Sequence, residues 1–71
     1  MKNKGFPQIL KEKREEHGLS RLMLANKLGT HYAIIRNWEV GFCYPNLIML
    51  CALADVFDCS IDELVGRQLY I

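Results

Sequence analysis

The chain has 71 residues, 51% of them hydrophobic, and a formal net charge of +1. This length corresponds to one small domain, and no apolar run approaches the roughly 18 residues that a membrane-spanning helix needs. The basic residues near the start are followed by Gly5 and Pro7 rather than by a hydrophobic signal region. We therefore expect a cytoplasmic protein without a membrane segment.

The charges are distributed unevenly along the chain. Residues 1–38 carry eight Lys or Arg against three Glu, a net of +5, whereas residues 39–71 carry one Arg against five acidic residues, a net of −4. Such an asymmetry predicts a basic face and an acidic face. The basic half is the natural side for a nucleic acid, although the total charge is lower than in most DNA-binding domains.

The cysteines and histidines do not form a recognisable chemical site. Cys43, Cys51 and Cys59 are spaced eight residues apart, with no C-x-x-C pair and no histidine at ligand spacing. Cys51 lies on a face predicted to be buried, where a thiol behaves as a small apolar side chain. Neither histidine has a carboxylate or a nucleophile at a useful spacing, so the sequence predicts no metal, no cofactor and no catalytic residue.

Residues 1–5 are expected to form a loose basic tail, and a helix is predicted over about 7–17. Pro7 suits the first turn of that helix, because its missing N–H is not needed there. Gly18 follows the last turn and favours its termination. The side chains of this helix that are expected to face the core are those of Phe6, Ile9 and Leu10.

Two short amphipathic helices are predicted next, joined by a turn that contains Gly29. Ser20 is a suitable N-cap for the first, over 21–28, and the second begins at 31 or 32 and ends near 39 or 40. This arrangement is typical of a helix-turn-helix, in which the second helix is presented to a partner. The apolar faces of the two helices consist of Leu24, Ala25, Leu28, Ile35 and Trp38.

Two more helices are predicted in the C-terminal half. Asn46 is a suitable N-cap for the first of them, and Ser60 begins the second in a capping box with Glu63. Every predicted element is helical, so we expect a compact all-α domain of five helices. The residues that give the fourth helix its apolar periodicity are Leu47, Leu50, Cys51, Leu53, Ala54 and Phe57.

Several short motifs in one register resemble a known family. They are Leu24-Ala25-x-x-Leu28-Gly29, Ile35-x-x-Trp38-Glu39-x-Gly41 and Leu53-Ala54-x-x-Phe57 followed by Ser60-Ile61-Asp62-Glu63-Leu64. Together they resemble the Cro/repressor-type helix-turn-helix domains, also called the XRE family. The resemblance covers residues 6–67, with 68–71 as an apolar extension, and implies a lambda-repressor-like fold. It also implies a bacterial or phage transcriptional regulator, in the simplest case a repressor, that binds operator sites in double-stranded DNA.

The resemblance implies roles for individual residues. In such domains the second helix of the motif, here about 31–39, lies in the major groove. Asn37 is able to pair bidentately with adenine, and Ala33 is able to contact a thymine methyl group. The expected base contacts are Tyr32, Ala33 and Asn37. The expected backbone or flanking contacts are Ser20, Arg21, His31, Arg36 and Tyr44.

Two further expectations concern contacts within the protein and between copies. Family members commonly join an Arg near the end of their first helix to a Glu at the end of the recognition helix, and Arg14 and Glu39 occupy those positions. One helix reads only a few base pairs, so a homodimer is expected. Its contact is expected at the apolar C-terminal end, at Leu69, Tyr70 and Ile71.

The start of the second helix of the motif departs from the family pattern. Tyr32, Ala33 and Ile34 form an apolar opening for a helix that reads bases, and the loop 42–44 lacks basic residues. Aromatic side chains in these two places also suit a protein partner. The alternative function is therefore a protein-interaction or antitoxin-like module on the same fold, and neither alternative is an enzyme.

Overall fold

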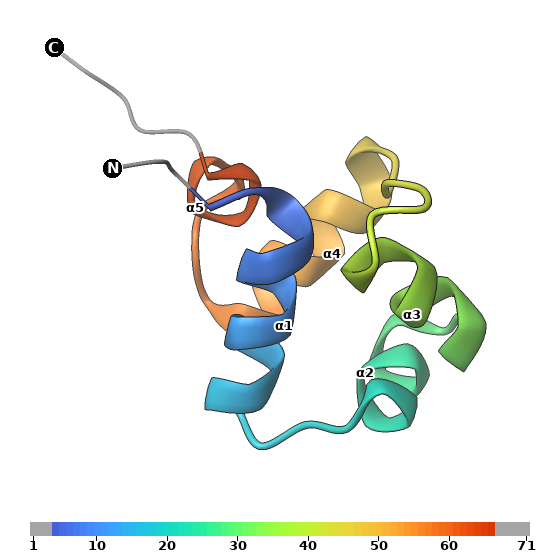
Figure 1. Cartoon of the computed structure of the whole chain (residues 1–71). Helices are drawn as coiled ribbons and strands as arrows, with labels where there is room; N and C mark the ends of the chain where they lie inside the picture. Colours follow the sequence, from blue (N-terminus) through green and yellow to red (C-terminus); the bar gives the residue numbers. More distant parts are fainter. Residues whose placement is uncertain (1–3, 67–71) are drawn as a thin grey trace, which may run out of the picture.

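The computed structural model describes residues 4–66, which contain helices, turns and loops but no strand. Residues 1–3 of the predicted tail and the predicted dimer contact at Leu69, Tyr70 and Ile71 lie outside the described residues. The predicted all-α fold is confirmed, and each helix boundary lies within about a residue of its expected position. The elements are α1 (Phe6–Glu16), α2 (Arg21–Leu28), α3 (Tyr32–Glu39), α4 (Leu47–Phe57) and α5 (Ile61–Val65) (Figure 1).

Three helices begin at the polar residues that the sequence indicated. Ser20, Asn46 and Ser60 cap α2, α4 and α5, each accepting a hydrogen bond from the N–H three residues further on, at 3.0, 2.9 and 3.1 Å. Each bond satisfies a backbone donor that has no partner within its helix. The predicted capping box at α5 is only half formed, because the Glu63 carboxylate lies 3.5 Å from Lys13 Nζ on α1 instead of closing on its own cap.

The hydrophobic core lies where the five helices converge. α2 packs on α3, α1 lies against α3 and α5, and α4 contacts α2 and α5. Among the described residues every member of this core is apolar, so the core itself is held by apolar contact. Its members are Phe6, Leu10, Leu24, Ala25, Ile35, Trp38, Leu53, Phe57 and Leu64.

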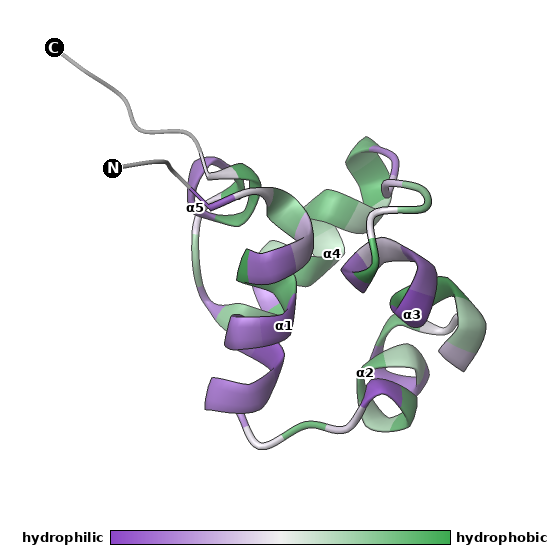
Figure 2. Ribbon diagram, viewed as in Figure 1, coloured by the Kyte–Doolittle hydropathy of each residue, from purple (hydrophilic) through white to green (hydrophobic). Residues whose placement is uncertain are grey.

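The sequence prediction was wrong for the outer side of α4. Leu47 and Cys51, both expected to face the core, are exposed, whereas Leu53 and Phe57 are buried as predicted. α4 is hydrophobic along most of its length (Figure 2), so apolar spacing does not single out one face. Within the described range no helix is long and apolar enough to cross a membrane.

The end of α5 approaches the start of α1 closely at Gly66. Its φ of 75° is left-handed, and a Cβ built there would overlap the carbonyl oxygen of Lys4. We expect Gly66→Ala to cost about 2–3 kcal/mol, because a left-handed Ala costs roughly 1–2 kcal/mol and the Lys4 backbone must also move. For a domain of this size each kcal/mol lowers the melting temperature by about 4–8 °C. Thermal unfolding followed by circular dichroism measures the change.

Gly29 provides the matched control for this substitution. It has a similar φ of 70°, but a Cβ there would meet nothing within 4 Å. Gly29→Ala should therefore show the conformational cost without the steric one. A loss of stability in Gly66→Ala no larger than that in Gly29→Ala would contradict the close packing of α5 on the Lys4 backbone.

Candidate nucleic-acid interface

The α2–turn–α3 unit is built from local signals that fix the direction of both helices. α2 ends at Gly29, whose left-handed conformation reverses the chain, and Thr30 N–H donates to the Ala25 carbonyl at 2.9 Å. Ala25 and Leu24 are buried at the crossing with α3. α3 then begins at Tyr32 without a side-chain cap from His31. The two helices are thus held by a three-residue turn and a shared apolar contact.

α3 buries one side and exposes the other. Ile35 and Trp38 face the core, whereas Tyr32, Ala33 and Arg36 are exposed. These three, with Asn37, follow one another at i, i+1, i+4 and i+5, which places them along one face of a helix. The predicted base contacts therefore share a surface, on the side of α3 opposite the core.

Asn37 is the most constrained of the predicted base contacts. It is half-buried, and its side-chain Oδ1 accepts a hydrogen bond from Arg36 Nη1 at 3.3 Å. Its backbone carbonyl accepts from the N–H groups of Phe42 and Cys43 at 2.9 and 3.4 Å. The loop after α3 is therefore attached to the same residue that is expected to meet a base.

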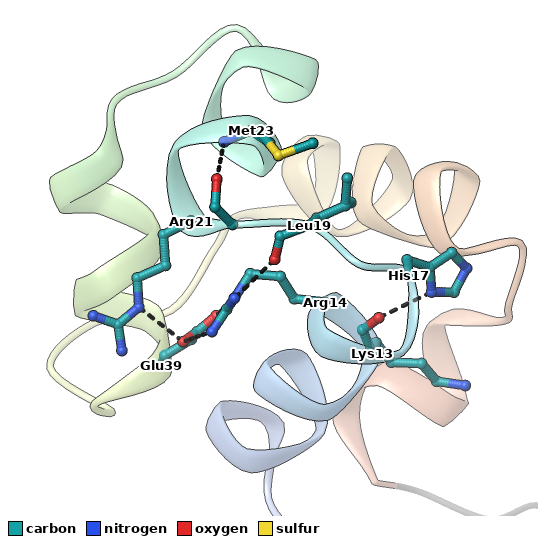
Figure 3. Close-up of polar contacts among 8 residues, drawn as sticks. Lys13, Arg14, His17, Leu19, Arg21, Met23 and Glu39 are labelled. Atoms are coloured by element: carbon teal, nitrogen blue, oxygen red, sulfur yellow. Dashed lines mark hydrogen bonds and ion pairs between the residues drawn. The ribbon is translucent and has the colours of Figure 1, made fainter.

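A carboxylate at the end of α3 joins three helices. Arg14 Nε on α1 lies 2.6 Å from Glu39 Oε2, and Arg14 Nη2 lies 3.2 Å from Oε1. A third nitrogen of Arg14 donates to the Leu19 carbonyl at 2.9 Å, so both guanidinium edges are used (Figure 3). The Glu39 side chain is only 1% exposed, and a bidentate arginine is the partner best suited to a carboxylate out of contact with water. The pair expected from the resemblance is present.

The Arg21 side chain also contacts this carboxylate. This contact was not predicted from the sequence. Arg21 Nε lies 3.0 Å from Glu39 Oε1. Hydrogen bonding with the Tyr32 side chain and with Glu39 raises the pKa of Arg21. Arg21, expected to bind a phosphate, thus links the start of α2 to the end of α3, with its side chain still partly exposed. No spacing in the sequence signals this contact, because it joins residues 18 apart across a turn.

Tyr44, expected at the DNA backbone, lies beside the start of α1. Its ring is 6.0 Å from that of Phe6, tilted by 55°, and much of the side chain is exposed. Phe42, two residues earlier in the loop, is more exposed still. The structure therefore brings Tyr32, Ala33, Arg36 and Asn37 onto one surface, while Tyr44 belongs to the loop that follows α3.

The surface formed by α2 and α3 is free of acidic side chains. Residues 20–38 contain no Asp or Glu, and the first acidic residue after them, Glu39, is buried against two arginines. Arg21, Lys27 and Arg36 supply positive charge. A phosphate chain approaching this surface meets no exposed carboxylate from residues 20–38, although the positive charge is modest.

Two titratable groups away from this surface, His17 and Cys59, have contacts that fix their local environment. Within the described range no three His, Cys, Asp or Glu side chains gather as metal ligands. His17 Nδ1 lies 2.9 Å from the Lys13 carbonyl, to which it donates, and the imidazole packs on Phe57. Burial raises the pKa of the Cys59 thiol, which keeps it protonated at neutral pH and a weak nucleophile.

The match to known proteins is carried by this same α2–α3 unit and the helices around it. The helix-turn-helix family matches residues 10–64, well over half of the chain. The chain belongs to the helix-turn-helix family. The transcriptional regulator AnsR of Bacillus subtilis is 37% identical to it over 59 residues, which are 83% of this chain and 51% of AnsR. The chain thus spans about half the length of AnsR.

Two solved helix-turn-helix structures extend the comparison. The restriction-modification controller protein C.AhdI from Aeromonas hydrophila superimposes with a TM-score of 0.77 at 32% identity, covering 83% of this chain and 89% of that one. The P22 c2 repressor, in complex with a synthetic operator, superimposes with a TM-score of 0.85 over 92% of this chain and 98% of that one. At 23% identity the second likeness concerns the fold alone. The predicted repressor-like fold is confirmed.

Proposed function

We propose that this helix-turn-helix chain binds double-stranded DNA sequence-specifically, as a transcriptional regulator that presents α3 to the major groove. The observation that carries the proposal is the exposed face of α3, where Tyr32, Ala33, Arg36 and Asn37 lie together on a scaffold fixed by the Glu39 ion pairs. A helix that reads bases must pack firmly against its own domain on one side and expose its opposite side to the DNA. α3 meets both requirements.

The chemistry of this face suits particular bases. Asn37 carries the amide group that pairs with the N6 and N7 atoms of adenine, and the methyl group of Ala33 suits contact with thymine. Asn37 would have to exchange its hydrogen bond from Arg36 for one to a base. Arg36 is then free to turn to a phosphate or a guanine, so the pair would act together on binding.

The backbone contacts come from the helix ends. Ser20 and Arg21 lie at the start of α2 and His31 at the start of α3, where backbone N–H groups and the helix dipole favour a phosphate. Arg21 reaches a phosphate with the guanidinium nitrogens that do not face Glu39. Such contacts position a protein on the duplex without reading its sequence.

The relatives support regulation rather than catalysis. AnsR is a transcriptional regulator by name, C.AhdI is a restriction-modification controller, and the P22 c2 repressor was captured on an operator. One α3 helix spans only a few base pairs, so we further propose that two copies act as a homodimer on two half-sites. Repression is the simplest output, because a protein seated on an operator blocks access to it.

A protein-interaction module is the second candidate. The exposed aromatic side chains of Tyr32 and Phe42 favour it, because such groups are enriched in protein interfaces. Under this alternative the chain has no specific affinity for duplex DNA. The two candidates therefore separate in a single binding measurement.

Selection of duplexes from a random DNA pool, followed by titration at increasing salt, tests the proposal. We expect one enriched motif whose affinity falls on the order of 10³-fold between 50 and 200 mM salt, as for about six phosphate contacts per dimer. Asn37→Ala should relax the preference at one base pair of each half-site and cost about 1–3 kcal/mol per copy. No enriched motif, or an affinity independent of salt, would refute DNA binding and favour the protein-interaction module.

A further inference from the structure

Several exposed apolar side chains follow α3 in the loop and on the first turn of α4. They are five residues, here called the α3–α4 patch, whose exposed fractions lie between 56 and 80%: Val40, Phe42, Tyr44, Leu47 and Ile48. Leu47 and Ile48 belong to α4 and the others to the loop before it. Cys51, also exposed, lies one helical turn beyond Leu47 and Ile48 on the same side of α4.

The α3–α4 patch reaches the upper end of the apolar patch sizes found on monomeric proteins. An aromatic side chain presents about 150–250 Å² and the aliphatic ones somewhat less, so the five exposed fractions amount to on the order of 600 Å². A typical monomer shows no larger apolar patch than about 300–600 Å². A standard protein interface takes about 800 Å² from each partner. The patch therefore supplies most of one side of such an interface.

The loop that carries the patch is held in place. The N–H groups of Phe42 and Cys43 donate to the Asn37 carbonyl at the end of α3. The Tyr44 ring packs beside Phe6 at the start of α1, with 6.0 Å between the ring centroids. A surface fixed in this way loses little conformational freedom on association. The exposure of these side chains is thus a property of the folded domain.

The charge pattern favours a second copy of the same chain as the occupant. No Asp, Glu, Lys, Arg or His occurs between Val40 and Ala54. In a two-fold contact the same surface meets itself, so every charge near the axis would face a like charge. A patch without charge avoids that repulsion, and it also lacks the groups by which a different protein would be selected.

We propose that the α3–α4 patch is the homodimer contact of this protein. The inference rests on the homodimer of the proposed function and replaces the C-terminal contact at Leu69–Ile71 and the DNA contact of Tyr44 that were expected from the sequence. The patch begins at the residue that follows α3. Contact between two patches therefore sets the distance between the two α3 helices directly, without an intervening element.

Sedimentation equilibrium of Ile48→Asp tests the proposed contact. Ile48 is largely exposed, so the substitution should leave the helical circular dichroism spectrum of the folded domain unchanged, while two carboxylates would face each other across the axis. We expect a dimer in the wild type and a dissociation constant raised at least ~100-fold in the variant. Leu22→Asp is the matched control, because Leu22 is an exposed leucine on α2 outside the patch; its dimer should be unchanged.

Cys51 provides a second measurement that needs no substitution. Its alkylation by a maleimide, followed by mass spectrometry of the Cys51 peptide, should slow as the protein concentration rises through the dimer range. An alkylation rate independent of concentration, or an Ile48→Asp protein that stays dimeric, would overturn the proposed contact. The second result would also direct attention to Leu69–Ile71.

The outcomes for the dimer and for DNA binding are distinguishable. An Ile48→Asp monomer that still binds a single half-site with the wild-type salt dependence supports the patch as a dimer contact and leaves α3 as the reading helix. A wild-type chain that binds the selected DNA but stays monomeric, alone and on a two-half-site duplex, overturns the dimer contact while DNA binding stands. A dimer dispersed by Ile48→Asp without any DNA binding supports the contact and refutes the proposed function.

Discussion

Glu39→Ala is expected to lower the melting temperature by about 12–24 °C. The substitution leaves the guanidinium groups of Arg14 and Arg21, which lie 2.6 and 3.0 Å from the Glu39 carboxylate, facing each other without an anion. Removing one partner of a buried ion pair costs about 3–5 kcal/mol; because both arginines are partly exposed, about 3 kcal/mol is a fair expectation. A domain of this size loses about 4–8 °C per kcal/mol. Thermal unfolding monitored by circular dichroism gives the value.

Two variants separate the buried network from an ordinary ion pair. Glu12→Ala removes the carboxylate that Lys4 contacts at 2.8 Å on the surface, and exposed pairs of that kind contribute about 0–1 kcal/mol. Glu39→Gln keeps one of the two acceptor oxygens and loses the charge, so its melting temperature should lie between those of the wild type and Glu39→Ala. If Glu39→Ala melted no lower than Glu12→Ala, the Glu39 network would not be what fixes α3 against α1 and α2.

The elements that the sequence predicted best are those with an unambiguous pattern. Trp38 stands between two polar residues and lies three residues after Ile35, so the spacing identifies the buried side of α3. Gly29 and the caps at Ser20 and Asn46 act through chemistry local to the chain. Such features depend on a few adjacent residues and can therefore be predicted from the sequence without knowledge of the fold.

The prediction of buried residues was wrong in α4, where the sequence does not alternate between apolar and polar sides. In α4 apolar residues occur on every side, and which of them are buried depends on where α2 and α5 pack. Leu53 therefore enters the core while Leu47 and Cys51 remain outside. The polar network shows the same limit, because Arg21 reaches Glu39 only after the turn at Gly29 has brought α2 across α3.

The shared exposure of residues on α3 could be predicted from the sequence, whereas the contacts among their side chains could not. Tyr32, Ala33 and Arg36 are exposed together, as a helix of that register requires. The hydrogen bond from Arg36 to Asn37 joins adjacent side chains whose rotamers the sequence does not specify. It matters for function, because the two residues proposed to meet DNA are already engaged with each other.

Arg36→Glu is expected to weaken binding to the selected DNA on the order of 10³-fold or more. Arg36 is exposed on the α3 face opposite Ile35 and Trp38, and each copy would exchange a favourable contact for a carboxylate beside phosphates. A lost arginine contact costs about 1–3 kcal/mol, a dimer loses it twice, and each 1.4 kcal/mol is tenfold in affinity. Fluorescence anisotropy on the selected duplex at fixed salt measures the loss.

Lys13→Glu is the control, because it changes the net charge by the same two units at a distance from α3. Lys13 lies on α1 and pairs with Glu63 on α5 at 3.5 Å, on elements that the DNA is not expected to touch. If binding depends only on overall charge, both variants should weaken it equally, by a small and salt-sensitive factor. A loss confined to Arg36→Glu would mean that the charge must stand on α3, whereas equal losses would contradict the assignment of α3 as the reading helix.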